Sequence, residues 1–206
     1  MKRHINIIGA GIAGLSAGCY LQMNGYETQI FELHNLPGGL CTAWKRKGYT
    51  FDGCIHWLVG SSSGNTFYKL WNELIDMEKL KFIDHEYYIK VEEKSGKSMT
   101  VFCDVVRMET EMLEKAPEDR VVIEEFVTGV RKLMNFRLPI EKAPEIYNLL
   151  DFIKMMMSMI PYMGEMKKWA GISAMEFAGR CRNELLRKTF LCMFLPTMNV
   201  LFLVLI

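Results

Sequence analysis

The sequence predicts an α/β fold that opens with a Rossmann-like βαβ unit and continues into an α+β region. Three observations support this prediction. An apolar run at residues 5–8 leads directly into a glycine-rich turn at 9–14, and a helical pattern follows to about residue 24. A second apolar run at 28–31 then ends in the acidic residue Glu32. Strand, glycine turn, helix, strand and acid in this order form the dinucleotide-binding fingerprint.

Each glycine of the turn has a predicted task. Gly9 allows a tight turn after the strand, and Gly11 lets a pyrophosphate approach the backbone because it lacks a side chain. Gly14 lets the helix pack against the strand, and the helix N-terminus then points its amides at the phosphates. Glu32 lies 18 residues after Gly14, where its carboxylate can bind ribose hydroxyls. The alternative interpretation is a glycine-rich turn with no ligand.

Composition excludes several classes of protein. The 206 residues carry a net charge of +1, and no basic block exceeds residues 45–47, so we expect no nucleic-acid surface. Six cysteines occur without a C-x-x-C pair, which argues against zinc or any other metal and against a disulfide framework. This cysteine usage suits a reducing compartment, and we expect a cytoplasmic protein with possible membrane association. The glycines at 9–14 interrupt the apolar N-terminal segment, so a nucleotide turn explains it better than a signal peptide.

A second glycine turn follows the acid closely. Gly38 and Gly39 come directly after Pro37, and a plain NAD site does not require such a pair. The pair is what we expect where the backbone must also pass close to a longer cofactor, with a flavin beyond the pyrophosphate. Further along, Gly48 predicts a turn between two short extended pieces, and residues 52–53 give another turn signal.

The combination of the 9–14 turn, Glu32, the segment 37–39, the segment 48–53 and His56 resembles the phytoene desaturase and retinol saturase group of FAD-dependent oxidoreductases. This group belongs to the wider class that includes flavin amine oxidases. The match is dense over residues 5–60 and looser beyond them. The resemblance implies FAD as the cofactor and a polyene or isoprenoid-like lipid as the substrate.

The resemblance also implies which residues meet the cofactor. Gly9, Gly11, Gly14 and Glu32 would hold the ADP moiety, and the second glycine turn would lie near the pyrophosphate or flavin. Asp52 and His56 would lie near the flavin end, although a turn residue and a partly buried structural histidine are the alternatives. The complete expected set is Gly9, Gly11, Ile12, Ala13, Gly14, Glu32, Leu33, Gly38, Gly39, Leu40, Thr42, Asp52 and His56. No catalytic residue is assigned.

Beyond residue 60 the pattern becomes mainly helical. Helical spacing at 66–75 precedes two strand-like runs at 87–92 and 99–103, which predict a β-hairpin. Helices are expected at 105–115, 118–136 and 146–163, the last with a break at Pro161, and shorter helices begin near Ser173 and Asn183. We expect residues 1–72 to be the N-terminal part of an FAD-binding domain. Residues 73–206 would be a partial substrate domain.

Two apolar stretches, residues 155–166 and 190–206, are expected to be shielded from water by other apolar groups. Residues 155–166 contain six methionines, which suit the protein's own core, an adaptable wall for a lipophilic substrate, a membrane surface or a partner. The run 190–206 is uncharged and interrupted by Pro196, so a buried helix followed by a short buried segment at 200–206 is preferred to a tail anchor. The missing C-terminal half of a longer enzyme, or a dimer partner, would cover this apolar end.

The resemblance has a further consequence, because the enzymes of this group are much longer and complete their FAD domain with a later glycine-rich segment. Both regions here would then be incomplete. The expected function is an FAD-dependent oxidoreductase, as a fragment, of the kind that desaturates or saturates carbon–carbon bonds of polyene lipids. The alternatives are a flavin amine oxidase-like enzyme and a truncated, non-catalytic nucleotide-binding module.

Overall fold

The computed structural model describes residues 3–52, 58–137 and 142–193. The chain forms two compact units, Met1–Lys81 and Phe82–Ile206. Each unit is considered by itself.

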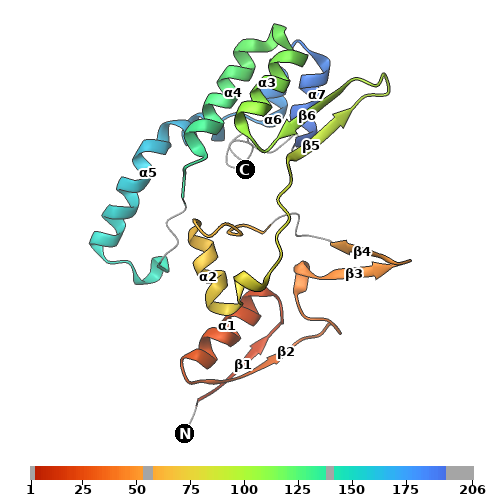
Figure 1. The fold of residues 1–206 in the computed structure, drawn as a ribbon. Coiled ribbons are helices and arrows are strands. Elements are labelled where there is room, and N and C mark those ends of the chain that lie inside the picture. Colours follow the sequence, from red (N-terminus) through yellow and green to blue (C-terminus); the bar gives the residue numbers. More distant parts are fainter. Residues whose placement is uncertain (1–2, 53–57, 138–141, 194–206) are drawn as a thin grey trace. The chain divides into compact units, whose positions relative to one another are not determined.

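The first unit begins with the βαβ motif predicted from the sequence (Figure 1). Strands β1 (His4–Ile8) and β2 (Glu27–Phe31) pair in parallel, and helix α1 (Ile12–Met23) connects them. Ile7 lies opposite Ile30 in this register, and both side chains reach Gly18 of α1. The helix therefore packs on one face of the sheet through a glycine that leaves room for the two isoleucines.

The remainder of the first unit is a hairpin and a second helix. Strands β3 (Ala43–Arg46) and β4 (Tyr49–Asp52) pair antiparallel, and the turn between them contains Gly48 at φ +81°. Helix α2 (Thr66–Leu74) starts at the capping residue Asn65, and Glu73 accepts a 2.6 Å hydrogen bond from Tyr20 of α1. The expected domain boundary at residue 72 falls inside α2, whereas the compact units meet between Lys81 and Phe82.

The second unit contains the predicted hairpin and five α-helices among its described residues. Strands β5 (Tyr87–Glu92) and β6 (Ser98–Phe102) pair antiparallel. The helices are α3 (Val105–Lys115), α4 (Arg120–Leu133), α5 (Leu149–Ala170), α6 (Ala174–Ala178) and α7 (Glu184–Met193). Ser173 and Glu176 form the capping box at the start of α6, and Asn183 accepts hydrogen bonds from the first amides of α7. Both predicted helix starts are thus confirmed.

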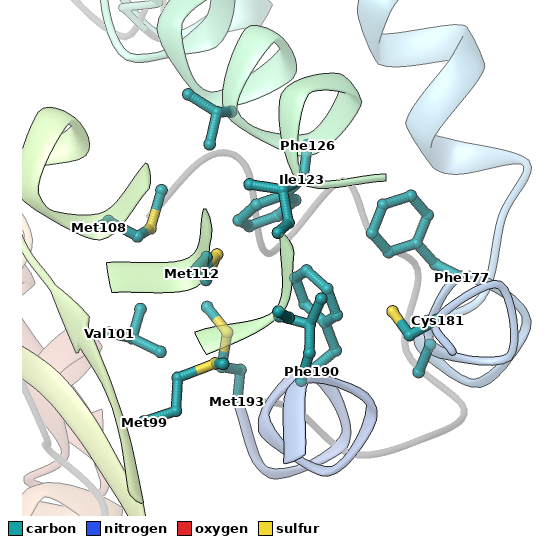
Figure 2. Close-up of a cluster of buried hydrophobic side chains, with 14 of the residues drawn as sticks. Met99, Val101, Met108, Met112, Ile123, Phe126, Phe177, Cys181, Phe190 and Met193 are labelled. Carbon is teal, nitrogen blue, oxygen red and sulfur yellow. The ribbon is translucent and has the colours of Figure 1, made fainter. Parts of the chain in front are cut away.

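The core of the second unit lies between the hairpin, α3, α4, α6 and α7. Figure 2 shows the side chains converging, with Met99, Met112 and Met193 gathered on one side of the cluster. Phe126, Phe177 and Phe190 form a mutually tilted or edge-to-face group with ring centroids 5.0 to 6.1 Å apart. These buried aromatic rings give the unit its main apolar burial.

Helix α5 lacks the predicted break at Pro161, and its methionines narrow the alternatives left open for them. It runs without a break through Pro161, because its second half is fixed to α4 by Trp169 and by the Lys132–Glu165 ion pair at 2.6 Å. Tertiary packing therefore outweighs the cost of an interior proline. The methionines at 155–166 are not buried in the unit's own core, since they are exposed or half-buried and only Met166 packs against it.

The described helices include none that is both long and apolar enough to cross a lipid bilayer. The buried segment expected at 200–206 lies outside the described residues, as do Gly53 and His56.

Candidate functional site: a dinucleotide-binding turn

The site is built on the turn that connects β1 to α1. Gly9 leaves the strand at φ +95°, a conformation that favours glycine, and its amide donates a 2.7 Å hydrogen bond to the carbonyl oxygen of Phe31. This bond ties the turn to the end of β2. The carboxyl ends of both parallel strands and the start of the helix therefore meet at one edge, which is where α/β sheets bind ligands.

The other two glycines of the turn have different surroundings. A methyl group at Gly14 would lie 2.1 Å from the Gly9 carbonyl oxygen, so the helix can approach the strand only without a side chain there. A methyl group at Gly11 would meet no atom of the described residues within 4 Å. The missing side chain at Gly14 thus serves packing, whereas the one at Gly11 leaves open space in front of the backbone.

The N-terminus of α1 is suited to an anion. Gly11 is the N-cap residue and offers no side-chain cap, and the first turn of the helix carries no acidic residue. The first amides of an α-helix lack partners within the helix, and the helix dipole makes this end positive. A phosphate placed against Gly11 would meet the amides that follow it, those of Ile12, Ala13 and Gly14.

Glu32 lies at the mouth of this turn. One carboxylate oxygen accepts a 2.6 Å hydrogen bond from the Ala10 amide, and the other accepts a 2.8 Å bond from the His34 amide. These backbone donors, His34 first and then Ala10, hold the pKa of Glu32 below its usual value. An ionised carboxylate is therefore fixed beside the turn, where it can accept hydrogen bonds from sugar hydroxyls. Leu33, the next residue in the expected set, is fully exposed.

The second glycine turn rests on the first. Gly38, at φ +119°, donates a 2.7 Å hydrogen bond to the Ala10 carbonyl oxygen and forms a parallel bridge with Gly11. A methyl group at Gly39, which has φ +59°, would lie 3.2 Å from the Gly11 Cα atom. Two glycine segments that are distant in sequence thus form one surface made mostly of backbone.

The residues after the second turn differ in their contacts. Thr42 donates a 3.1 Å hydrogen bond from its hydroxyl to the Gly39 carbonyl oxygen and closes the turn. Leu40 is largely exposed beside it. Asp52 is the last residue of β4 and lies opposite Ala43 in the hairpin. His56 lies outside the described residues.

Three contributors were not in the expected set. Ala10 supplies an amide to Glu32 and a carbonyl to Gly38, Phe31 supplies the carbonyl that holds Gly9, and His34 supplies the second amide to Glu32. All act through backbone atoms, so their side chains give no signal of the role. Only Ala10, a small buried residue between two glycines, leaves a trace in the sequence.

The fold and this turn define a Rossmann-like dinucleotide-binding domain, and residues 7–74 match the family described as NAD(P)-binding Rossmann-like domain. The chain is 29% identical over 124 residues to a protein of Danio rerio named inactive all-trans-retinol 13,14-reductase, covering 58% of this chain and 20% of that protein. It is 29% identical over 113 residues to the zeta-carotene-forming phytoene desaturase of Myxococcus xanthus, covering 54% and 22%.

The resemblance to the phytoene desaturase and retinol saturase group is thus confirmed for the N-terminal portion of the chain. The aligned segments span about a fifth of the length of these relatives. Among solved structures, a putrescine oxidase variant from a redesign of cofactor binding superimposes with a TM-score of 0.49 and 16% identity, covering 99% of this chain and 41% of that one.

Proposed function

We propose that this chain supplies the ADP-binding part of an FAD-dependent oxidoreductase that acts on carbon–carbon bonds of polyene or isoprenoid lipids. The observation that supports the proposal most is the open space at Gly11, bordered by an uncapped helix N-terminus and by the fixed carboxylate of Glu32. This arrangement fits a diphosphate joined to a ribose.

FAD is favoured over NAD by the second glycine turn. Gly38 and Gly39 extend the backbone surface beyond the first turn, as a longer cofactor requires. The chain is also similar to a protein named as a phytoene desaturase and to one named as an inactive all-trans-retinol reductase. When bound, FAD would supply the hydride chemistry, and the protein would position the cofactor and the lipid. Gly11, Ile12, Ala13 and Gly14 would hold the pyrophosphate, and Glu32 the ribose.

The test compares Gly11→Val with Gly64→Val. Gly11 has φ −72° and ψ 176°, which valine can adopt, and both glycines face open space, so both variants should fold like the parent. Titration calorimetry with FAD, ADP and NAD should show binding by the parent protein and by Gly64→Val. Gly11→Val should bind FAD at least about tenfold more weakly, because its side chain occupies the space expected for the pyrophosphate.

Equal FAD affinity in all three proteins would contradict the placement of the pyrophosphate at Gly11. A parent protein that binds none of the three ligands would favour the non-catalytic module. For the substrate class, the whole enzyme to which this chain contributes is tested under anaerobic conditions. Phytoene should reduce its oxidised flavin, or all-trans-retinol should reoxidise its reduced flavin, and flavin absorbance would report either change. An unchanged flavin spectrum with either lipid would contradict the proposed substrate.

A further inference from the structure

Helix α5 carries a band of exposed apolar side chains along its outer face. Eight of its residues are exposed to between 38% and 74%, namely Leu149, Leu150, Phe152, Ile153, Met156, Met157, Ile160 and Met163. Soluble proteins rarely leave a contiguous apolar surface of this size uncovered unless it is an interaction site. The band lies within the second unit and has no part in the nucleotide site.

Five of these residues form a regular line, which we call the α5 seam: Leu149, Ile153, Met156, Ile160 and Met163. Their spacings alternate between four and three residues, as at the a and d positions of a heptad repeat. In this register isoleucine occupies both a positions, and leucine or methionine occupies the d positions. In parallel pairs, isoleucine at a with leucine at d favours two helices, and here methionine takes two of the three d positions. The seam extends about 21 Å along the helix.

The other side of α5 is already engaged with its own unit. The Tyr162 ring packs edge-to-face on Phe136 at 5.2 Å, and its hydroxyl donates a 3.3 Å hydrogen bond to the Asn135 carbonyl oxygen. Glu165 pairs with Lys132 at 2.6 Å, and Trp169 is fully buried beside Gly129. These contacts fix the rotation of the helix and turn the seam outward.

Within residues 149–163 the charges of α5 lie off the seam, whereas Lys167 occupies the a position that follows Met163 in the same register. In the same register Asp151 and Glu165 occupy f positions, and Lys154 and Lys168 occupy b positions. Asp151 is also engaged locally, since it pairs with Lys142 and belongs to the capping box with Asn148. Along residues 149–163 two seams can therefore meet without bringing like charges together, although an in-register parallel pair would place Lys167 against its counterpart. Pro161 falls at a b position.

The size of the band matches a dimer interface. A stable interface buries about 800 Å² per partner, and eight large apolar residues, each roughly half exposed, present a surface of that order. A helix that lies in a lipid interface carries a polar face rich in lysine and arginine. The opposite face of the second half of α5 is instead packed against its own unit through Tyr162 and Trp169, which favours a protein partner.

From these observations we infer that a second copy of this chain packs on the α5 seam, in a two-fold symmetric helix pair. Each seam serves as the partner of the other, so the interface is self-complementary. Leu150, Phe152 and Met157 flank the pair and widen its apolar contact.

The test measures the oligomeric state of the full chain by sedimentation equilibrium over a range of concentrations. The parent protein should be a dimer, and Ile153→Glu should raise the dissociation constant at least about a hundredfold, because it places a carboxylate in an apolar interface. The control Ser158→Glu introduces the same charge at an exposed f position and should leave the dimer unchanged. Circular dichroism should show equal helicity for all three proteins.

Charge pairing gives an independent readout that also reports the orientation. Ile153→Glu mixed with Ile153→Lys should restore the dimer if the helices are parallel. If they are antiparallel, a positions face d positions, and Ile153→Glu mixed with Met156→Lys should restore it. A monomeric parent, a dimer insensitive to Ile153→Glu, or failure of both mixtures would overturn the inference. A monomeric parent that sediments with phosphatidylcholine–phosphatidylserine vesicles, and loses this with Ile153→Glu, would assign the seam to a lipid surface.

Discussion

At the scale of single residues, Glu32 joins two parts of the nucleotide site before any ligand is considered. Its two carboxylate oxygens accept hydrogen bonds from Ala10 in the first glycine turn and from His34 after β2. The carboxylate that is expected to bind ribose thus also holds the turn on which a diphosphate would rest. Substitution of this residue should affect the folded state as well as the affinity for ligands.

This role predicts a pH dependence of stability. The amides of His34 and Ala10 lower the pKa of Glu32, so its contribution is complete above the ordinary carboxyl pKa of about 4.3 and is lost as the pH falls through the folded-state value. Urea unfolding of the parent and of Glu32→Gln should differ most at neutral pH and converge in acid. A constant difference between the two proteins from neutral pH to strong acid would contradict this assignment.

The sequence identified the glycines, whose role depends on having no side chain, and the acidic residue, whose role depends on its charge. Gly9, Gly14 and Glu32 occupy the turn, the helix contact and the mouth of the site as expected. It could not identify Ala10, Phe31 or His34, because their contributions come from backbone amides and carbonyls that every residue possesses. Asp52 pairs with Ala43 at the end of the hairpin, and its place near a flavin stays a prediction.

At the scale of elements, the packing of α5 on α4 depends on a glycine. A methyl group at Gly129 would lie 2.6 Å from the Nε1 atom of Trp169, a fully buried side chain. Gly129 therefore allows the indole ring to lie directly against the backbone of α4, which fixes the second half of α5.

We expect Gly129→Ala to destabilise the second unit. Alanine gains about 1 kcal/mol of helix propensity over glycine, but overpacking against Trp169 should outweigh this gain and leave a net loss of roughly 1–3 kcal/mol. Gly164→Ala in α5 is the matched control, because no atom lies within 4 Å of the added methyl group. That variant should gain about 0.5–1 kcal/mol. Chemical unfolding followed by circular dichroism measures both, and a neutral or stabilising Gly129→Ala would refute the packing argument.

Most elements were predictable because their local signals agreed with their packing. The hairpin β5–β6, the helices α3 and α4, and the capping residues Ser173 and Asn183 all occur where periodicity and caps indicated. The break predicted at Pro161 was wrong, because helix propensity does not include tertiary contacts such as the burial of Trp169. The packing partner of the methionines at 155–166 could not be predicted either. Composition indicates that these apolar side chains are buried against something, but it does not identify the partner.

At the scale of the whole molecule, the two units differ in how much apolar surface they bury. The buried hydrophobic residues described in the first unit are Ala10 and Met77, whereas the second unit has the large cluster around Phe126 and Phe190. Burial of apolar surface is the main stabilising contribution to folding. The first unit should therefore be the less stable of the two.

Hydrogen exchange followed by mass spectrometry in increasing urea should reveal this difference. Peptides from the first unit should lose protection at lower urea than peptides from α3, α4 and α7. FAD at a hundredfold excess over its dissociation constant should stabilise the first unit by about 2.7 kcal/mol and leave the second unit less affected. A single transition shared by all peptides, with or without FAD, would contradict separate stabilities for the two units.

The hydrogen bond from Gly38 to the carbonyl oxygen of Ala10 has a mechanical consequence. Because the two glycine turns touch at Gly11 and Gly39, neither can shift without displacing the other. A substitution that shifts one turn should therefore shift the other. A substitution near Gly38 would then weaken the binding of a phosphate at Gly11, and the loss of affinity would resemble that of a substitution in the first turn.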